Sequence, residues 1–423
     1  MKKIYLSVFA GLFSLALLSC STSSDYSAGD AKPEAEFDMH APLQVPALSS
    51  LSQTAPRTLK GQYHPVQWSV LPGWADDHAE NLWITLVNNC RGLMRPISGS
   101  LTIPARATPQ DWQPFCTEVA QFTREHGDNP EPHMVKFFLE QHLQPWELVG
   151  RGMATGYYEP IVYGSKKRQG QSQWPMYAAP KDLLTIDLGS VYPELAGKRV
   201  RGKLEGNKVV PYDTRAQISA NSNKPPVIAW LNDPVEAFFL QVQGSGRVQL
   251  DDGRSIRLAY ADHNGRPYTS IGRWLADQGE LPLAQTSMQN IKAWAQKNPH
   301  RVDEMLNVNE AMVFFREEAI RDSIAGPKGA YGIPLVAQRT VAVDPDYVPL
   351  GSPLYLATTY PASNRPLERV VFAQDTGGAI KGAARIDYFW GSGDEAGEQA
   401  GRMKQDTQVW VLWPVGMGEP SAR

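Results

Sequence analysis

Residues 370–382 read VVFAQDTGGAIKG, and this stretch decides the fold because an apolar run ends on an acid inside a glycine-rich loop. The run from Val370 to Ala373 favours a buried strand, and Asp375 lies just beyond it. Glycines let the backbone turn sharply and leave room for a ligand to approach. The pattern is typical of an acid presented at the wall of a cleft, although an ordinary turn aspartate would produce it as well.

Two further apolar runs bring acids to strand ends. Residues 340–343 lead to Asp344, and residues 383–386 lead to Asp387. Carboxylates gathered on strand ends repel one another, so one of them stays protonated to higher pH and can serve as a general acid near neutrality. A single aspartate of this kind is commonly a cap or turn residue, but three in one pattern favour a site.

Local surroundings predict different roles for the three acids. Asp387 is the candidate acid, because Ile386 and the aromatic residues 388–390 can desolvate it and raise its pKa. Asp375 lies in a polar, glycine-rich loop that suits orientation and hydrogen bonding. Asp344 precedes Pro345 and is expected to hold a loop.

The rest of the chain divides into a helical part and a β-rich part. Residues 73–148 carry helical periodicity, and short β-type runs with turn signals follow, beginning with residues 154–164. We interpret residues 238–258 as a strand, a Gly-Ser-Gly segment and a hairpin at Asp252-Gly253. The segment fits neither a nucleophile elbow nor a phosphate loop. Its glycines would let a ligand lie close to the backbone near Gln243 and Ser245, and a plain β-bulge is the alternative.

The first residues predict export. Lys2 and Lys3 precede an apolar run from Ile4 to Leu18, which is shorter than a membrane span and typical of a signal peptide. Its end, residues 17–20 (LLSC), resembles the lipobox of bacterial lipoproteins, in which the cysteine, here Cys20, is lipidated. An ordinary cleaved signal peptide is the alternative. The residues up to 56 are rich in Ser, Ala, Pro and acids and predict a flexible tether.

Composition and cysteine usage narrow the chemistry. A net charge of −3 gives no basic footprint for nucleic acid. Cys90 and Cys116 each lie on an apolar helical face, so a disulfide and two separate buried thiols are both open. The 8 histidines are scattered, and none has ligand spacing to a cysteine or an acid. We expect neither a metal nor a cofactor.

Several long motifs resemble one family. VAVDPDYVPLG, FAQDTGGAIKG and RIDYFWGSGDEAGEQAG look like the three-aspartate domain that closes the membrane-bound lytic murein transglycosylase A family, and GYYEP with LQVQGSGRVQLDDG resembles that family's own signature. The resemblance implies a mainly β fold with α segments (α+β), a double-psi β-barrel domain with a second, inserted smaller β-barrel domain. The expected boundaries are a lipoprotein signal peptide (1–19), a tether (20–56), a helical N-terminal part of the barrel domain (57–158), an inserted β domain (159–325), a C-terminal three-aspartate part (326–415) and a tail (416–423).

The resemblance also implies a site. The family's catalytic acid falls on Asp387, with Asp375 beside it. Candidate substrate-binding residues are Tyr157, Gln243, Gly244, Ser245, Asp344, Gly377, Gly378, Lys381 and Trp390.

The implied reaction cleaves the β-1,4 bond between N-acetylmuramic acid and N-acetylglucosamine without water, leaving 1,6-anhydromuramic acid, with one aspartate acting as acid and then base. Two alternatives stay open: an inverting hydrolase of peptidoglycan or another β-glycan with Asp375 as base, and a non-catalytic glycan-binding lipoprotein. The implied partners are peptidoglycan glycan strands, the outer membrane through the lipid anchor, and cell-wall synthesis proteins. Because Ser21 and not aspartate follows Cys20, the implied location is the periplasmic face of the outer membrane.

Overall fold

The computed structural model describes residues 37–51, 58–95, 105–186, 188, 191–192, 200–320 and 322–421. The predicted signal peptide, the lipidation site Cys20 and the tether as far as residue 36 lie outside the described residues. The chain divides into two units, Met1–Asp38 and Met39–Arg423, and the helices and strands described lie in the second. Among the described residues, no helix has both the length and the apolar character needed to cross a bilayer.

The described residues of the helical part predicted from periodicity form three α-helices, and the region then ends in a strand. The bounds are α1 (Leu82–Met94), α2 (Pro109–His126), α3 (Pro132–His142) and β2 (Leu143–Leu148). Thr108 occupies the N-cap position of α2 with Pro109 in the first turn, although the threonine side chain makes no capping bond. Cys90 and Cys116 are fully buried and form a disulfide that joins α1 to α2, with their Cα atoms 5.5 Å apart.

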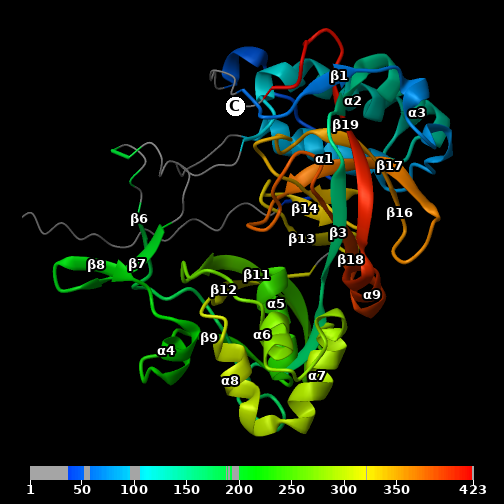
Figure 1. The fold of residues 1–423 in the computed structure, drawn as a ribbon. Coiled ribbons are helices and arrows are strands. Elements are labelled where there is room, and N and C mark those ends of the chain that lie inside the picture. The colour runs from blue at the N-terminus through cyan, green and yellow to red at the C-terminus, as the bar shows by residue number, and fades with distance from the viewer. Residues whose placement is uncertain are drawn as a thin grey trace, which may run out of the picture. The chain divides into compact units, whose positions relative to one another are not determined.

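Six strands close into a barrel (Figure 1). Their order around the ring is β19 (Lys404–Pro414), β16 (Pro353–Thr359), β17 (Pro366–Asp375), β15 (Thr340–Ala342), β18 (Ile386–Ser392) and β3 (Gly152–Glu159), and β3 pairs back with β19. The pairs β15–β17 and β18–β3 are parallel. On the outer side of β19, the sheet continues through β2 to β1 (Tyr63–Pro65). This closed ring, in which the strands do not follow their order in the chain, agrees with the mainly β barrel that the resemblance implied.

A second sheet of six strands is built from the chain between β3 and β15. Its order is β12 (Val313–Ala319), β11 (Ser255–His263), β10 (Ser245–Leu250), β4 (Ile161–Ser165), β9 (Val227–Leu231) and β5 (Trp174–Tyr177). A bridge between Ala178 and Phe315 joins its two edges. The β10–β11 pair confirms the predicted hairpin, with Gly253 in the turn at φ 85°. Val248, Leu258 and Leu240 lie in its core.

The interpretation of residues 238–243 as a strand is wrong, because they belong to a helix. Asp233 caps α5 (Pro234–Gln243) by accepting hydrogen bonds from two backbone amides, and Gly244 ends it in the left-handed conformation at φ 80°. The alternation of apolar and polar residues suggested a strand, but Val235, Phe238 and Leu240 are all buried against neighbouring elements. The strand begins only at Ser245.

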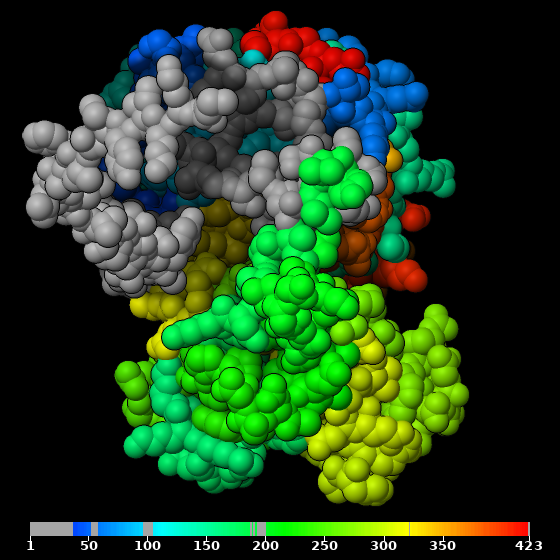
Figure 2. All heavy atoms as spheres, turned by 90° about the vertical axis from the view of Figure 1, so that its left-hand side faces the viewer, coloured from blue at the N-terminus to red at the C-terminus, as the bar shows by residue number. Residues whose placement is uncertain are grey.

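The remaining elements lie around the two sheets. Two short helices, α6 (Ile271–Asp277) and α7 (Met288–Lys297), contain Trp274 and Ile291. The bounds are α4 (Arg215–Ala220), α6 (Ile271–Asp277), α7 (Met288–Lys297), α8 (Val302–Asn307), α9 (Asp394–Arg402), a three-stranded sheet of β6 (Leu184–Ile186), β7 (Val200–Glu205) and β8 (Lys208–Pro211), and the hairpin β13 (Ala325–Lys328)–β14 (Pro334–Val336). Figure 2 turns the side that carries α4 and β6–β8, in green, toward the viewer.

Candidate active site

The acids of the predicted site are brought together by strand register. Asp375 of β17 and Asp387 of β18 both lie opposite Ala342 of β15, and Asp387 lies opposite Thr155 of β3 on its other side. Residues directly opposite in a sheet point to the same face, so these side chains form one row across four strands. Ala342 lies between the two acids, and its methyl side chain leaves space between the carboxyl groups of Asp375 and Asp387.

A bulge in β17 sets the position of Asp375. The pairing with β15 skips Gln374, whose buried side chain turns the other way to bond Asn89 and Thr340. Bulges commonly re-aim a side chain next to a site. Asp387 differs from the expectation in a smaller way: it is the second residue of β18 and does not end a strand. Residues 383 and 384 form a turn, and pairing with β3 starts at Ile386.

Asp387 has the surroundings of a general acid. The Thr155 hydroxyl donates a hydrogen bond of 2.5 Å to Oδ1 of Asp387, whereas Oδ2 has no partner among the described residues. Burial raises the pKa of Asp387 to about 6, the charge of Asp375 adds to this, and the hydrogen bond from Thr155 and the charge of Arg385 oppose it. The carboxyl group therefore exchanges its proton close to neutral pH and has one oxygen free to do so.

Asp375 is held much more firmly. Its Oδ1 accepts hydrogen bonds from the backbone amides of Ala330 and Thr376, at 2.8 and 2.9 Å, and its Oδ2 accepts one of 3.1 Å from the Tyr157 hydroxyl. Burial raises the pKa of Asp375, although these three donors oppose the shift. Tyr157 in turn stacks on Phe389 with ring centroids 5.1 Å apart. Burial and the two nearby carboxylates raise the pKa of Tyr157 well above its ordinary value, so it remains a neutral donor.

Sequence reasoning missed two residues that position the acid. Nη2 of Arg385 donates a hydrogen bond of 2.8 Å to the Thr155 hydroxyl oxygen, which leaves the hydroxyl proton to point at Asp387. Thr155 directly precedes the motif GYYEP and stands two residues before Tyr157. Arg385 stands two residues before Asp387. A strand's period of two places such neighbours on one face and was the available signal.

Asp344 organises the glycine-rich loop. Its Oδ2 accepts a hydrogen bond of 2.9 Å from the Gly382 amide, and the Lys381 ammonium lies 3.6 Å from its Oδ1. Asp344 is buried, whereas Gly378 and Lys381 are exposed and Gly377 is half-buried. The loop is therefore anchored at its end by a buried acid and presents its middle to solvent.

The remaining predicted substrate-binding residues lie at the α5–β10 junction and at Trp390. Gln243 accepts a long hydrogen bond of 3.4 Å from the Tyr158 amide, which brings the α5–β10 junction with Gly244 and Ser245 next to β3. Trp390 does not share the face of Asp387. Its ring packs edge-on against Tyr388, with the ring centroids 5.0 Å apart, and it borders a separate cavity of about 600 Å³ lined also by Tyr360, Arg365 and Glu395.

Gly156 of the GYYEP motif leaves space for the Trp390 indole on the face of the sheet opposite Asp387. A Cβ on Gly156 would lie 2.7 Å from the Trp390 indole, so any side chain there would displace the ring.

Within the residues that the structure describes, no group of three or more His, Cys, Asp or Glu is arranged to hold a metal ion.

The closed β-barrel thus holds a carboxyl group whose pKa is raised to about 6 and whose Oδ2 has no partner among the described residues, an arrangement typical of enzymes that use a carboxylic acid. Two domain families match the chain: the MltA specific insert domain over residues 153–316 and the 3D domain over residues 339–413. Membrane-bound lytic murein transglycosylase A of Escherichia coli K12 is 33% identical over 303 residues, which cover 70% of this chain and 74% of that protein. The chain belongs to the membrane-bound lytic murein transglycosylase A family.

Solved structures agree with this assignment. MltA from Neisseria gonorrhoeae aligns with a TM-score of 0.74 at 35% identity, covering 90% of this chain and 99% of that chain. E. coli MltA with bound chitohexaose aligns with a TM-score of 0.57 at 27% identity, covering 86% and 94%.

Proposed function

We propose that the protein is a peptidoglycan lytic transglycosylase that cleaves the β-1,4 bond between N-acetylmuramic acid and N-acetylglucosamine without water. The observation that carries the proposal is the state of Asp387: a partly desolvated carboxyl group with a pKa of about 6, one oxygen held by Thr155 and the other free. Membership of the transglycosylase family and the chitohexaose bound to a relative support a glycan as the ligand.

The first step uses Asp387 as an acid. Its proton passes to the glycosidic oxygen as the bond from that oxygen to C1 of the muramyl residue breaks, and N-acetylglucosamine leaves with a free hydroxyl. Because the pKa lies near the working pH, a useful fraction of the enzyme carries the proton and the driving force for transfer stays high. Thr155 and Arg385 hold the carboxyl group in one orientation while this happens.

The second step uses the same group as a base. The Asp387 carboxylate takes the proton of the muramyl C6 hydroxyl, whose oxygen forms a bond to C1 and closes the 1,6-anhydro ring. The proton lost in the first step is thereby restored, and no water is consumed. Intramolecular attack can supply roughly 7 to 11 kcal/mol when the reacting atoms are well oriented.

The inverting hydrolase is the less favoured alternative because of the contacts of Asp375. A base in that reaction needs an oxygen free to hold and deprotonate water. Three of the roughly four acceptor sites of the Asp375 carboxylate already receive hydrogen bonds, from Ala330, Thr376 and Tyr157, which leaves a single site for water. These donors suit an acid that orients Tyr157 and raises the pKa of Asp387. A non-catalytic glycan-binding protein would have no use for a free, protonatable oxygen at Asp387.

Digestion of purified cell-wall sacculi in water labelled with heavy oxygen tests the reaction. We expect products that end in 1,6-anhydromuramic acid and contain no label, as measured by mass spectrometry. Labelled reducing ends as the main product would establish a hydrolase and make Asp375 the candidate base.

We also propose that a lipid on Cys20 attaches the protein to the periplasmic face of the outer membrane, and that cell-wall synthesis proteins are among its partners. The relatives are named membrane-bound, and the N-terminal motif resembles a lipobox. Detergent partitioning of Cys20→Ala tests the anchor: the variant should move to the aqueous phase with its activity intact. Unchanged membrane association would contradict lipidation as the main attachment.

A further inference from the structure

A second cavity, of about 320 Å³, lies wholly within the chain segment between β4 and β12. None of the residues that line it belongs to the row of acids on the barrel. Its wall is largely apolar and aromatic, and exposed residues of α4 form one side of its rim. The wall includes Trp174, Tyr177, Phe238, Leu306 and Met312, and the rim includes Ala216, Ser219 and Ala220.

Arg215 places a buried positive charge in this wall. The side chain is 6% exposed and packs over the Phe238 ring, 5.0 Å from its centroid. Nε donates to the Asn309 carbonyl at 3.0 Å, and Nη2 donates to Gln241 Oε1 and the Ala311 carbonyl at 2.9 and 2.5 Å. All three acceptors are neutral. Nη1 has no hydrogen-bond partner among the described residues.

Arg215 lacks a carboxylate counter-ion among the described residues, unlike three of the other buried arginines. Arg201, Arg257 and Arg339 each pair with a carboxylate within 2.8 Å. Arg106 also lacks such a pair in the described part of the chain, but it packs on Tyr331 and lies outside this cavity. A buried guanidinium is stabilised by an anion, and burial alone lowers the pKa of Arg215 to about 10. Asp303, an acid that lines the same cavity, forms no ion pair with Arg215 in the described structure.

The geometry points to a carboxylate as the missing partner, and we infer that the cavity binds the carboxylate end of a short peptide with small apolar side chains. A guanidinium edge matches a carboxylate in shape and charge. The Tyr177 hydroxyl, also without a partner among the described residues, offers a second donor. The apolar wall and the volume suit two small residues and no more.

This inference rests on the proposed function for the identity of the peptide. Glycan strands of peptidoglycan carry short peptides whose free ends are carboxylates on alanine of the D configuration. A site of this kind would let the enzyme favour strands that still carry peptides, through contacts made away from the bond that is cleaved. A carboxylate and not a phosphate is favoured because Asp303 at the same cavity would repel a second negative charge.

Calorimetric titration of the mature protein with N-acetyl-D-alanyl-D-alanine and with its C-terminal amide tests the inference. The acid should bind at least about tenfold more tightly than the amide, which loses the charge that Arg215 recognises. Acetate should bind much more weakly than the peptide, because it leaves the apolar wall uncovered. Equal affinity for acid and amide would overturn the proposal, and tighter binding of inorganic phosphate than of the peptide would overturn the choice of ligand.

A variant at the rim separates this cavity from other peptide-binding surfaces. Ser219→Trp should fill the mouth without touching the bonds of Arg215 and should weaken binding of the acid at least tenfold, whereas Lys224→Trp, at an exposed position outside the cavity, should not. If Ser219→Trp fails to fold by circular dichroism, Ala220→Trp replaces it, and the comparison of acid with amide on the wild-type protein decides in any case. Undiminished binding in a folded rim variant would overturn the site.

The titrations involve no turnover, so the two proposals fail separately. A wild-type protein that forms anhydro products but does not distinguish acid from amide disproves only the peptide site. A protein that binds the peptide but releases labelled reducing ends disproves only the transglycosylase reaction.

Discussion

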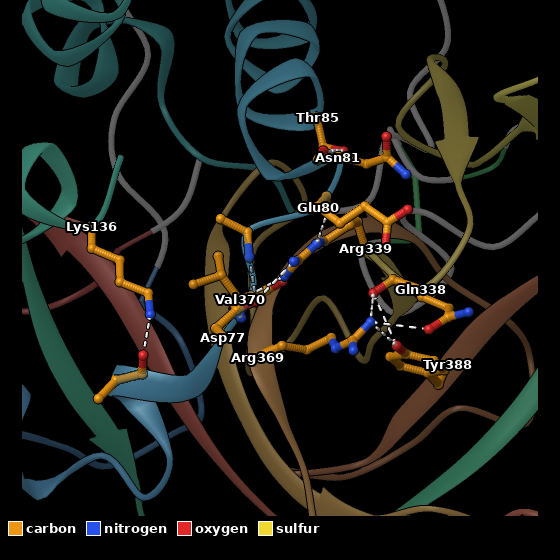
Figure 3. A network of polar contacts seen from close by, with 12 residues as sticks. Asp77, Glu80, Asn81, Thr85, Lys136, Gln338, Arg339, Arg369, Val370 and Tyr388 are labelled. Carbon is orange, nitrogen blue, oxygen red and sulfur yellow. Dashed lines mark hydrogen bonds and ion pairs between the residues drawn. The ribbon is translucent and has the colours of Figure 1, made fainter. Parts of the chain in front are cut away.

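Two aspartates of the barrel region, the buried Asp77 and the half-buried Asp387, have pKa values shifted in opposite directions. Asp77 receives a two-pronged pair of hydrogen bonds from the Arg339 guanidinium, at 2.8 and 3.0 Å, and a third from the Val370 amide (Figure 3). Burial disfavours its charged form, but the bonds and charge of Arg339 outweigh this and lower the pKa of Asp77. At Asp387, burial is opposed only by a hydroxyl and a more distant guanidinium, and the pKa rises to about 6.

The difference shows how one fold separates a structural carboxylate from a reactive one. Arg339 also bonds the carbonyls of Glu80 and Val370, so the Asp77 pair ties the segment before α1 to β15 and β17. Arg385 carries the same charge but is linked to Asp387 by hydrogen bonds only through the Thr155 hydroxyl. The hydroxyl between guanidinium and carboxylate keeps the orientation of the acid, while Asp387 lacks the direct, two-pronged hydrogen bonds that stabilise the charge of Asp77.

The largest expected effect is the loss of turnover in Asp387→Asn. The amide keeps the size and the hydrogen bond from Thr155 but has no proton to transfer, so the rate should fall at least about 10³-fold. Glycan binding, measured separately by affinity for purified strands, should survive. Asp394→Asn, an exposed aspartate of α9, is the matched control and should keep the wild-type rate. Near-native turnover in Asp387→Asn would disprove the single-acid mechanism.

Removing the charge at Asp77 should act on stability. Asp77→Asn leaves Arg339 buried without a counter-ion, which typically costs about 3 to 5 kcal/mol in the free energy of unfolding. The folded pKa of Asp77 is lowered, so its contribution is present above its unfolded pKa and is lost as the pH falls through the folded value. Urea unfolding should therefore show a loss that shrinks below roughly pH 4. Asp76→Asn, at the exposed neighbouring position, should change little, and an equal loss there would contradict the assignment.

Sequence could predict that Asp387 is desolvated and has a raised pKa, but not the contacts that tune it. The aromatic neighbours of Asp387 are adjacent in the chain, and the helices around Cys90 and Cys116 have a local period. The row of Asp375, Ala342, Asp387 and Thr155 depends on register between four strands, which no local pattern specifies. Residues 238–243 were misread because a short apolar run fits a strand and a helix equally, and only the capping by Asp233 decides.

The same substitution at Asp387 should stabilise the protein. Its folded pKa lies above the unfolded value near 4, so the wild type loses stability as the pH rises from about 4 to 6, and the asparagine variant does not. The gain at pH 7.5 should be about 2 kcal/mol, with at most about 3 from the full pKa difference. Thermal unfolding at pH 7.5 and pH 4 measures it, and the two proteins should coincide at the lower pH. A variant less stable than the wild type at pH 7.5 would mean that the carboxylate is stabilised by the fold.

The smallest expected effect is that of Thr155→Val, which keeps the shape and removes the hydroxyl between Arg385 and Asp387. The lost hydrogen bond favoured the carboxylate, so the pKa of Asp387 should rise further, and kcat/KM should fall with rising pH at a higher pH than in the wild type. Because the carboxyl group also loses its fixed orientation, turnover should drop about tenfold. Thr155→Ser restores the hydroxyl and should recover both the rate and the pH profile. The contrary outcome is a lower rate with an unchanged pH profile of kcat/KM that serine does not rescue. It would show that Thr155 only packs against its neighbours and that Arg385 acts on Asp387 without the Thr155 hydroxyl.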